Sequence, residues 1–324
     1  MKAMVIAANG GPEVFEEREM DTPVPGANEV LVRVRASSVN PADVGARRGM
    51  FGPHAMALPA VLGFDVAGTI GQVGPSVTGW VVGDDVYYAI PADAGHAGGY
   101  AEFNIAPASI LARKPSNLSF AEAAAVPVAG GTAWAALISR AAVRVGETVL
   151  IHGGAGGVGS FAVQIARAAG AFVFATCGAY DAARVRELGA HRVIDYRTEK
   201  FADVVLAETG GKGVDVCFTT VGGPLLAESL PVTRMGGRAV TVTGPAAGLE
   251  GAQFAAMMRN LTIHFAHLDE AAPKLEALRT LIKRGQLKPL ICATFPMTRV
   301  ADAHRLQEQG GETVYGKIVL EAVP

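Results

Sequence analysis

The stretch IHGGAGGVGS at residues 151–160 limits the possible folds of this chain more than any other feature of its sequence. Five of its ten residues are glycine, and it stands between the apolar run 148–152 and a segment of helical periodicity that ends near Ala169. The run Phe172–Thr176 then has the composition of a second strand. Strand, glycine loop, helix and strand in this order predict a βαβ unit with two parallel strands.

The glycines of this loop have the spacing of a dinucleotide-binding turn, G-x-G-x-x-G, at Gly154, Gly156 and Gly159. In such a turn the first glycine permits the tight turn, the second lets the backbone approach a pyrophosphate, and the third lets the helix pack closely on the strand. The helix N-terminus adds free N–H groups and a partial positive charge. A tight structural turn is the alternative, but the βαβ context favours dinucleotide binding.

The segments that follow continue to alternate between strands and helices, which predicts an α/β fold with a doubly wound parallel sheet and helices on both faces. We expect a helix at 181–188, strands at 191–194 and 214–218, a helix at 225–232 and a strand at 238–242.

The first 118 residues have a different texture, with short alternating runs separated by Gly, Pro and Asp turns, which predicts a β-rich region. A chain of 324 residues also exceeds the usual size of one domain. We predict one domain from 1–122 plus 269–324 and another from 123–268. Further expected elements are strands at 30–35 and 66–70, helices at 120–126, 132–141 and 273–284, and a strand at 317–320 that rejoins the first domain.

Charge and cysteine content exclude several classes of function. A formal net charge of −2 gives no electrostatic reason to expect nucleic acid or an anionic membrane as a partner. The apolar start of the chain is too short for a signal peptide or a membrane span, so we expect a soluble cytoplasmic protein. Cys177, Cys217 and Cys292 are far apart, and His264 and His267 read as strand surface, so we predict no metal site.

The end of the second strand bears on the choice of cofactor. An acidic residue there would bind the ribose 2′-OH of NAD, but residues 176–181 read TCGAYD, with Asp181 too late and better placed to cap a helix. NADPH is therefore the expected cofactor, with NADH possible. Arg184, Tyr196 and Arg197 are candidate partners of a 2′-phosphate, or ordinary surface residues.

Several motifs occur in order along the chain: SVNPAD at 38–43, PAVLGFDVAG at 59–68, GGYAEF at 98–103, VAGGTAW at 128–134, HGGAGGVGS at 152–160 and YGKIVL at 315–320. Together they make the whole chain resemble the zinc-independent, zeta-crystallin-like quinone oxidoreductases of the medium-chain dehydrogenase/reductase superfamily. The resemblance implies a Rossmann domain inserted into a GroES-like catalytic domain, with the nicotinamide and substrate in the cleft between them.

The same comparison implies that catalysis is metal-free. Zinc-dependent relatives have a cysteine where this chain has Asn40, and a GHE triplet where it has Gly63-Phe64-Asp65. They also carry a four-cysteine lobe where this chain has only the short span 88–99. Phenylalanine cannot ligate a metal, and a quinone is already a strong hydride acceptor that needs orientation more than a Lewis acid.

The resemblance also implies roles for individual residues. Asn40, Asp43 and Asp65 are the expected catalytic residues, with Asn40 donating a hydrogen bond to a substrate carbonyl; a plain turn residue before Pro41 is the alternative, and Asp65 could simply orient a loop. Thr132 is expected on the nicotinamide side of the cofactor. The full expected cofactor set is Thr132, Gly154, Ala155, Gly156, Gly157, Val158, Gly159, Gly178, Arg184, Tyr196, Val221, Thr243, Gly244 and Lys317.

The expected activity is hydride transfer from NADPH to quinones. An NADPH-dependent enone or enal reductase is the alternative within the same fold, and a cofactor-binding sensing or interaction protein with vestigial activity is the alternative of another class. Many relatives carry a tyrosine where this chain has Gly45, so we expect a wider, less polar pocket that accepts bulky polycyclic quinones. The run 261–265 reads as an edge strand that pairs in a homodimer, and a tetramer stays open.

Overall fold

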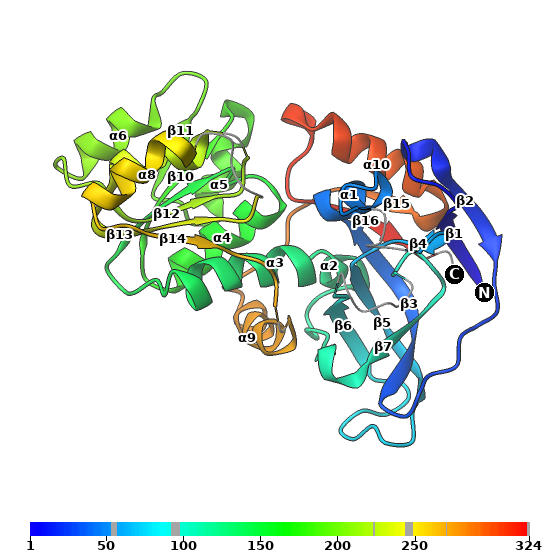
Figure 1. Cartoon of the computed structure of the whole chain (residues 1–324). Coiled ribbons are helices and arrows are strands. Elements are labelled where there is room, and N and C mark those ends of the chain that lie inside the picture. Colours follow the sequence, from blue (N-terminus) through cyan, green and yellow to red (C-terminus); the bar gives the residue numbers. More distant parts are fainter. Residues whose placement is uncertain (53–56, 92–97, 223, 244–248, 270, 323–324) are drawn as a thin grey trace. The chain divides into compact units, whose positions relative to one another are not determined.

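The computed structural model describes residues 1–52, 57–91, 98–222, 224–243, 249–269 and 271–322. The chain divides into two compact units (Figure 1). Unit 1 comprises Met1–Ala129, Asp269–Gly285 and Pro289–Pro324, and unit 2 comprises Gly130–Leu268 and Gln286–Lys288. In the part of the chain that is described, no helix combines the length and the apolar composition needed to cross a membrane.

Unit 1 is built on two β-sheets. The larger has the order β15-β16-β3-β5-β6-β8 with β7 also paired to β3, and the smaller has the order β2-β1-β4. Pairings are antiparallel except for β15 with β16. The strands are β1 Lys2–Ile6, β2 Phe15–Glu19, β3 Glu29–Val39, β4 Ala60–Val61, β5 Asp65–Val73, β6 Asp85–Ala89, β7 Phe103–Pro107, β8 Ala112–Arg113, β15 Ile291–Pro296 and β16 Lys317–Glu321.

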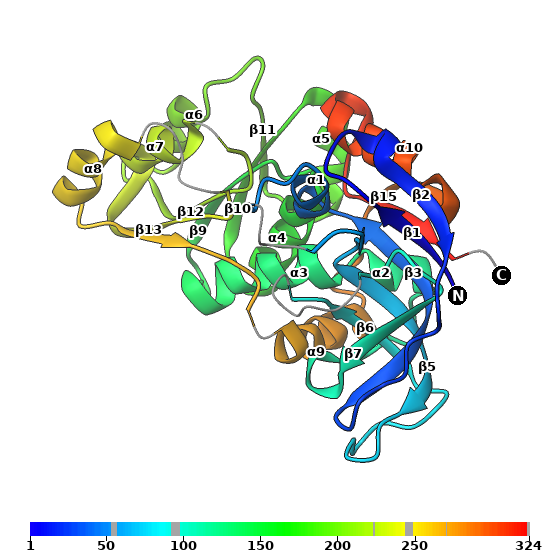
Figure 2. The same cartoon turned by 45° about the vertical axis from the view of Figure 1, so that its right-hand side comes forward.

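Among its described residues, unit 1 contains the helices α1 Pro41–Arg47, α2 Phe120–Ala124, α9 Ala271–Lys283 and α10 Val300–Gln309. Figure 2 shows α1 and α10 beside each other, and residues of the two helices are in contact. The predicted β-rich first region and the predicted return of the last strand to it are both confirmed, because β16 pairs with β3.

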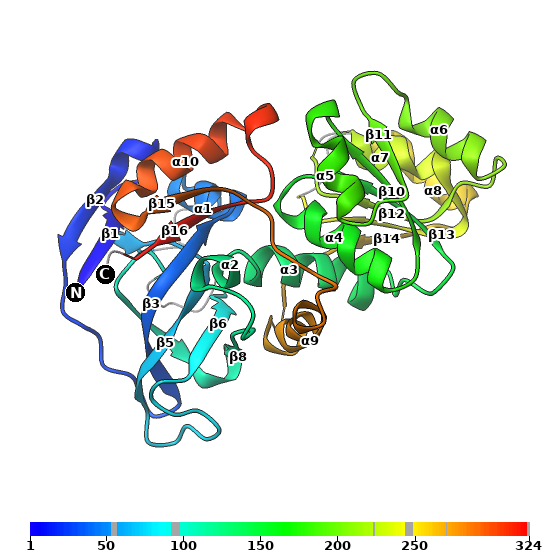
Figure 3. The same ribbon diagram turned by 180° about the vertical axis from the view of Figure 1, so that it is seen from behind.

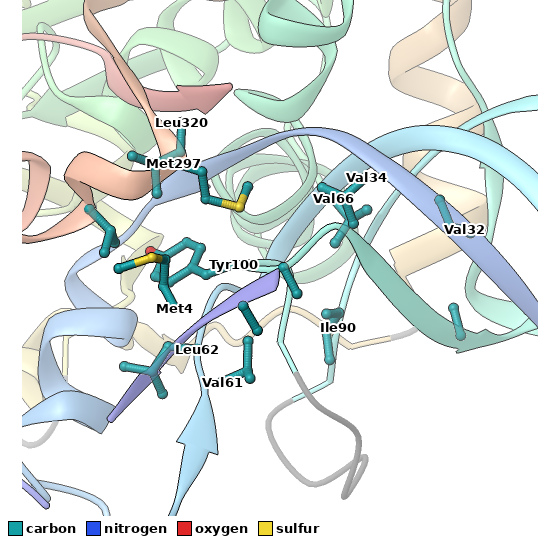
Figure 4. Close-up of a cluster of buried hydrophobic side chains, with 14 of the residues drawn as sticks. Met4, Val32, Val34, Val61, Leu62, Val66, Ile90, Tyr100, Met297 and Leu320 are labelled. Atoms are coloured by element: carbon teal, nitrogen blue, oxygen red, sulfur yellow. The ribbon is translucent and has the colours of Figure 1, made fainter. Parts of the chain in front are cut away.

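The core of unit 1 lies between its sheets and follows from the alternation of side chains along β3. Val30, Val32 and Val34 are all buried, as expected for successive residues on one face of a strand. Figure 4 shows Val32 and Val34 in this cluster together with Tyr100, whose side chain is fully buried next to Met4.

Unit 2 contains a six-stranded sheet in the order β11-β10-β9-β12-β13-β14, and all its pairings are parallel. The predicted doubly wound sheet is thereby confirmed. The reversal of strand order at β9 sends the crossover helices to opposite faces. Figure 3 shows α4 and α5 on one face, and Figure 1 shows α6 and α8 on the other. The strands are β9 Thr148–His152, β10 Phe172–Cys177, β11 Arg192–Asp195, β12 Val214–Thr219, β13 Thr233–Thr241 and β14 Thr262–Phe265.

The helices of this region match the predictions in part. The helix expected at 132–141 is the end of α3, Pro127–Trp134, continued by a π-helical segment Ala135–Arg140. The helix expected at 225–232 is divided into α7 Leu225–Ser229 and a 3₁₀ turn, because Pro231 lacks the N–H that would continue it. The remaining helices are α4 Gly157–Ala168, α5 Ala182–Glu187, α6 Phe201–Glu208 and α8 Leu249–Met258.

Candidate functional site

The glycine loop of unit 2 lies at the carboxyl end of the central strand β9 and leads into α4. Gly153 has a φ of +77°, a left-handed conformation that favours glycine. A Cβ on Gly159 would lie 1.9 Å from the carbonyl oxygen of Gly153, so only glycine lets α4 approach the loop this closely. A Cβ on Gly156 would meet nothing closer than 3.4 Å, so its bare backbone faces open space. That is the surface a pyrophosphate needs.

One expected role belongs to a different glycine. The tight turn requires Gly153, which precedes the G-x-G-x-x-G pattern, rather than Gly154. A Cβ on Gly154 would lie 3.0 Å from the Cβ of Ala175 and 3.3 Å from Cγ1 of Val185. Gly154 therefore allows the loop to pack against β10 and α5.

The first turn of α4 completes an anion-binding surface. Its N-cap is Gly156, which has no side chain to accept hydrogen bonds from the helix N-terminus. The N–H groups of Gly157, Val158 and Gly159 at the start of a helix have no partner within that helix and carry partial positive charge. Ala155 is buried, and Gly157 and Val158 are half-buried. The residues present therefore fit the pyrophosphate of a dinucleotide.

A row of buried polar side chains crosses the same edge of the sheet. The strand registers pair Thr176 with His152, His152 with Thr219, and Thr219 with Thr241. Each threonine hydroxyl bonds to a loop at this edge: Thr176 accepts from the N–H of Gly153, Thr219 from that of Val221 at 3.2 Å, and Thr241 from that of Thr243 at 3.2 Å. This row of polar side chains holds the loops in place. The sequence motifs did not predict it.

His152, which directly precedes the glycine loop, connects it to neighbouring elements through hydrogen bonds. Its Nδ1 lies 3.2 Å from the hydroxyl of Thr176 and its Nε2 lies 3.0 Å from that of Ser229. Burial lowers the pKa of His152 to about 4, so the ring is neutral near pH 7. A neutral ring offers one donor and one acceptor to its two hydroxyl partners, which makes it a link between β9, β10 and α7.

The tip of β10 brings together two of the residues expected to bind the adenosine end of a cofactor. The hydroxyl of Tyr196 would lie 3.9 Å from a Cβ on Gly178, and Tyr196 is 59% exposed. The guanidinium of Arg197 lies 5.7 Å from the Tyr196 ring centroid. An aromatic hydroxyl and a cation therefore stand where an acidic residue would bind a ribose 2′-OH.

Arg184 has a different environment from the one expected. It forms an ion pair with Asp181. Burial raises the pKa of the Asp181 carboxyl, and the Arg184 guanidinium partly offsets this rise. Asp181 stands at the N-cap of α5, but its side chain makes no capping hydrogen bond, so the expected capping role is wrong. The carboxylate binds the side chain one turn later instead.

The other expected cofactor residues are distributed as follows. Val221 follows β12 and is 43% exposed, and its Cγ2 would lie 3.0 Å from a Cβ on Gly153. Thr243 follows β13 and is half-buried, and Thr132 is buried in α3. Gly244 lies outside the described residues.

Unit 1 brings the three expected catalytic residues into one buried cluster through its strand registers. Because Ala36 pairs with Ala67, Ser38 faces Asp65, and the Ser38 hydroxyl donates to the Asp65 carboxylate. Because Val39 pairs with Ile318, Asn40 stands beside Lys317, the first residue of β16. The cluster thus joins segments that are 277 residues apart.

Lys317 belongs to this cluster rather than to the glycine loop. Its ammonium group donates to the carbonyl of Val39 at 3.0 Å, to Oδ1 of Asn40, and to Oδ2 of Asp65 at 3.3 Å. These three bonds use all three N–H groups, and the side chain is 4% exposed. Lys317 thus bonds to Asp65 and Asn40, and its expected contact with the cofactor stays a prediction.

Three hydrogen bonds hold the side chain of Asn40, and both of its N–H donors are used. Its Nδ2 donates to Asp65 at 2.8 Å and to Asp43 at 3.1 Å, while its Oδ1 accepts from Lys317. Asn40 is 3% exposed, and the two aspartates are fully buried. Direct donation from Asn40 to a substrate carbonyl, as expected from the resemblance, would require one of these bonds to break.

Asp43 and Asp65 hold backbone segments in place. Asp43 accepts from the N–H groups of Asn40 at 2.8 Å and of Gly63 and Phe64 at 3.1 Å each. Asp65 accepts from the N–H of Val128 at 2.7 Å. Burial and the nearby Asp65 raise the pKa of Asp43 to about 7, against the N–H groups that favour its carboxylate.

The space left by Gly45 is occupied by neighbouring side chains. A Cβ on Gly45 would lie 3.5 Å from Cζ of Phe51 and 3.8 Å from Sδ of Met50. These two side chains are 56% and 73% exposed. An exposed apolar pair therefore lies beside Gly45, and the wider pocket expected there stays a prediction.

The residues at the positions of the zinc ligands do not fit a metal. Asp65 is paired with an ammonium group, the Asn40 amide oxygen accepts from that same group, and Phe64 has no ligating atom. Elsewhere in the described part of the chain, no three His, Cys, Asp or Glu side chains are grouped as metal ligands would be.

Comparisons with known proteins agree with this architecture. Residues 26–116 match the family described as alcohol dehydrogenase GroES-like domain, and residues 188–320 match that described as zinc-binding dehydrogenase. A quinone oxidoreductase of Homo sapiens is 33% identical over 327 residues, which cover 99% of this chain and 97% of the relative.

Two further proteins extend the comparison. A 2-haloacrylate reductase of a Burkholderia species is 34% identical, with 98% of both chains covered. The crystal structure of Escherichia coli quinone oxidoreductase complexed with NADPH has a TM-score of 0.86 and 29% identity, covering 99% of this chain and 100% of that one.

Proposed function

Because the chain belongs to the medium-chain dehydrogenase/reductase superfamily and is related over its full length to quinone oxidoreductases, we propose that it reduces quinones with NADPH. The observation that carries the proposal is the loop from Gly153 to Gly159, whose bare backbone and helix N-terminus fit a pyrophosphate. When bound, the cofactor supplies the hydride. The protein supplies binding, orientation and exclusion of water.

NADPH is the proposed cofactor because the tip of β10 lacks the carboxylate that would repel a 2′-phosphate. Gly178 stands at this tip, with the hydroxyl of Tyr196 and the guanidinium of Arg197 close by. A phosphate accepts hydrogen bonds from both kinds of donor. The Escherichia coli relative was solved with NADPH, which agrees with this choice.

The cluster of Asn40, Asp43, Asp65 and Lys317 is proposed to position the reacting groups in unit 1. It fixes the start of α1 and the backbone at Gly63 and Phe64 with buried, mutually bonded charges. A quinone accepts hydride without a Lewis acid, and its reduced oxygen can take a proton from water. Rigid positioning is then the main requirement of the protein.

The exposed pair Met50 and Phe51 is proposed to contribute to acceptor choice. A flat polycyclic ring gains more from stacking on an aromatic side chain than a small ring does. We therefore expect phenanthrenequinone-sized acceptors to be reduced at least as efficiently as benzoquinone. Turnover of benzoquinone with rejection of the larger ring would contradict this proposal.

A second candidate is reduction of an activated C=C bond, which the 34% identity to a 2-haloacrylate reductase favours. That reaction must protonate carbon, so a positioned acid would help. Tyr87, Tyr88 and Tyr100 are fully buried, and their pKa values are raised by burial. These three tyrosines therefore do not supply such an acid.

The test is anaerobic oxidation of NADPH and NADH with benzoquinone, phenanthrenequinone and an enone, each with and without a chelator. We expect NADPH oxidation with quinones, unchanged by chelation. Oxidation of the cofactor with the enone but with neither quinone would favour reduction of a C=C bond as the function of the protein. Binding of NADPH without any turnover would favour the cofactor-binding sensor over either enzyme.

We also propose a homodimer. Strand β14 stands at the edge of the sheet, and Phe265 at its end is 48% exposed. An open strand edge presents backbone N–H and C=O groups without hydrogen-bond partners. The same strand of a second copy, related by a two-fold axis, would form hydrogen bonds with them. Light scattering after size exclusion would give a mass near 67 kDa, twice the 33.4 kDa of one chain. A mass of one chain would contradict the proposal.

A further inference from the structure

The two carboxylate oxygens of Asp65 bond to different parts of the chain. Oδ2 accepts from the hydroxyl of Ser38, from Nδ2 of Asn40 at 2.8 Å and from the ammonium group of Lys317 at 3.3 Å. Oδ1 accepts from the backbone N–H of Val128 at 2.7 Å. Asp65 is fully buried, so its carboxylate is not open to solvent. One oxygen therefore belongs to the cluster of buried polar residues, and the other holds a separate segment.

The segment held by Oδ1 is the first turn of α3, which begins at Pro127. Val128 is the second residue of this helix, where a backbone N–H has no acceptor within the helix. A carboxylate at a helix N-terminus also interacts favourably with the partial positive charge there. Asp65 on β5 therefore caps a helix that begins more than 60 positions later in the chain.

The helix α3 belongs to both units of the chain. Its first residues, through Ala129, lie in unit 1, and from Gly130 onward it is part of unit 2. Its π-helical continuation contacts β13 and β14 of the parallel sheet. The absence of a side chain at Gly131 lets Leu268 pack closely, because an added Cβ would lie 2.7 Å from Cδ1 of Leu268. A restraint on the first turn of such a packed, rigid element also fixes the turn that follows.

Thr132 lies in that following turn. It comes four residues after Val128, which places the two residues on the same side of the helix. Thr132 is buried and is the residue of α3 expected on the nicotinamide side of the cofactor. We infer that Asp65 is a positioning residue for hydride transfer, which caps α3 and thereby holds Thr132 in place. The inference rests on the proposed function for its effect on turnover.

Lys317 and Asn40 contribute to this cap through Asp65. Both donate to Oδ2, while Oδ1 accepts from Val128. The ammonium group also balances the buried negative charge. The charge and the cap can therefore be separated by substitution. An amide oxygen can replace Oδ1 as the acceptor, provided that the ammonium group is removed together with the carboxylate charge.

The experiment compares two double variants, Asp65→Asn with Lys317→Met and Asp65→Leu with Lys317→Met. Both remove the two buried charges, but asparagine keeps an oxygen that can accept from Val128, whereas leucine has none. We expect kcat for quinone reduction, per molecule that binds NADPH, to be about tenfold higher in the asparagine variant. The Kd for NADPH should be similar in both, because the glycine loop is unchanged. Equal kcat values would overturn the inference.

Asp215 provides the matched control, because its carboxylate has the same three kinds of donor. It accepts from the N–H and the hydroxyl of Thr148 at 2.8 Å each, and from the guanidinium of Arg234. The pair Asp215→Asn and Asp215→Leu, each with Arg234→Met, should show equal kcat per molecule that binds NADPH. A tenfold difference in this pair as well would show a general effect of losing a buried acceptor and would refute the role of Asp65.

Thr132→Val tests whether the cap acts through Thr132. Valine has the shape of threonine but lacks the hydroxyl group. With this substitution added, the ratio of kcat between the two Asp65 double variants should fall from about tenfold to less than about twofold, because an effect exerted through a group is lost with that group. A ratio that stays near tenfold would contradict the inference.

Amide hydrogen exchange of the unaltered chain tests the cap without turnover. Val128 and Val158 are each the second residue of a helix, and both are half-buried. Without NADPH, the protection factor of the Val128 amide should exceed that of the Val158 amide by about tenfold, because Val128 donates to Asp65. Equal protection factors would overturn the inference even in an active enzyme.

The same spectra separate this inference from the proposed function. NADPH should slow exchange at Val158, which belongs to the proposed pyrophosphate site. If Val128 is protected, but NADPH leaves Val158 unchanged and no acceptor is reduced, the proposed function fails and the cap of α3 by Asp65 stands.

Discussion

Lys317 lies 252 residues from Asp65 in the chain, yet its ammonium group is 3.3 Å from the carboxylate. Both groups are buried, so each would be an uncompensated charge without the other. The YGKIVL motif marked Lys317 as important and suggested the cofactor as its partner. The structure gives its ammonium group three acceptors within unit 1.

We predict that Lys317→Met lowers the free energy of unfolding by ~3–5 kcal/mol, because it leaves Asp65 buried without its cation. Urea denaturation at pH 7 measures the loss. Lys212→Met is the matched control, since Lys212 is exposed, and should change stability by less than about 0.5 kcal/mol. Equal effects of the two variants would contradict the assigned role of Lys317.

His304 gives a pH-dependent prediction whose sign follows from its lowered pKa of about 3. An unfolded histidine titrates near 6.5, so between pH 6.5 and 3 the unfolded chain binds a proton that the folded chain does not. The contribution of neutral His304 to the free energy of unfolding is therefore fully present above pH 6.5 and is lost as the pH falls toward 3. Between pH 7 and 5 wild type should lose about 2 kcal/mol more stability than His304→Gln.

The comparison with a variant is needed because Asp43 acts in the opposite direction. The pKa of Asp43 in the folded chain is raised to about 7, whereas in the unfolded chain it is near 4. The stability that protonated Asp43 contributes is therefore fully present below pH 4 and is lost as the pH rises toward 7. His152 acts in the same direction as His304. Urea titrations at both pH values measure the difference, and equal losses in wild type and His304→Gln would show that His304 is not held neutral.

The limits of sequence reasoning are clear at these residues. Asn40, Asp43 and Asp65 could be named from the sequence because each lies in a contiguous motif. Arg47, Tyr100 and His304 could not, because the contact of Arg47 with His304 spans 257 positions and depends on the packing of two helices. Arg47 contacts His304 and Glu308 because it is buried, and the sequence does not show that burial.

At the scale of single elements, the loop between β9 and α4 was predictable because its constraint is local. Glycine spacing and the change from strand to helix periodicity are both visible over 20 residues. The assignment of the turn to Gly154 was wrong because the sequence does not show which of two adjacent glycines takes a positive φ.

This loop gives a prediction in which two alanine substitutions have different effects. Gly156→Ala has room for its methyl group, with the nearest atom at 3.4 Å, so it should fold but weaken NADPH binding at least tenfold by blocking the pyrophosphate. Gly159→Ala would place its Cβ 1.9 Å from a carbonyl oxygen, so it should lower thermal stability. Fluorescence titration with NADPH and thermal melts test the pair, and unchanged NADPH affinity in Gly156→Ala would contradict the assigned pyrophosphate site.

The end of β10 gives a prediction about cofactor choice. Gly178→Asp would place a carboxylate beside Tyr196, where its nearest contact is 3.9 Å from the new Cβ, so the change should be accommodated. A carboxylate repels a 2′-phosphate and binds a 2′-OH. We expect the ratio of kcat/KM for NADPH over NADH to fall at least tenfold, with Ala207→Asp at an exposed position of α6 as the control. An unchanged ratio would place the adenosine end elsewhere.

Several elements were not predicted from the sequence, including α6, α8 and α10. In α10, Val300, Ala303 and His304 are the buried residues, so a polar ring takes part in the buried face. A pattern search for apolar periodicity does not count such a residue. Tertiary packing, through Arg47 and Tyr100, determines that His304 belongs to the core.

At the scale of the whole chain, the alternation of β-rich and βαβ sequence was sufficient to predict two units of different class. The registers within unit 1 were not predictable, because strands such as β3 and β16 come from opposite ends of the sequence. Periodicity gives the face of a strand but not its partner. The sequence assigned the strand at 317–320 to the first domain but did not identify β3 as its partner.

The pairing of β16 with β3 has a consequence for synthesis on the ribosome. The N-terminal part of unit 1 emerges long before Lys317, while Asp65, Asn40 and the edge of β3 already exist. Until β16 is made, the Asp65 carboxylate lacks its cation and the edge of β3 lacks its partner, which favours binding by chaperones or pairing with another nascent chain. Unit 1 therefore acquires its central counterion only after the chain of unit 2 has been synthesised.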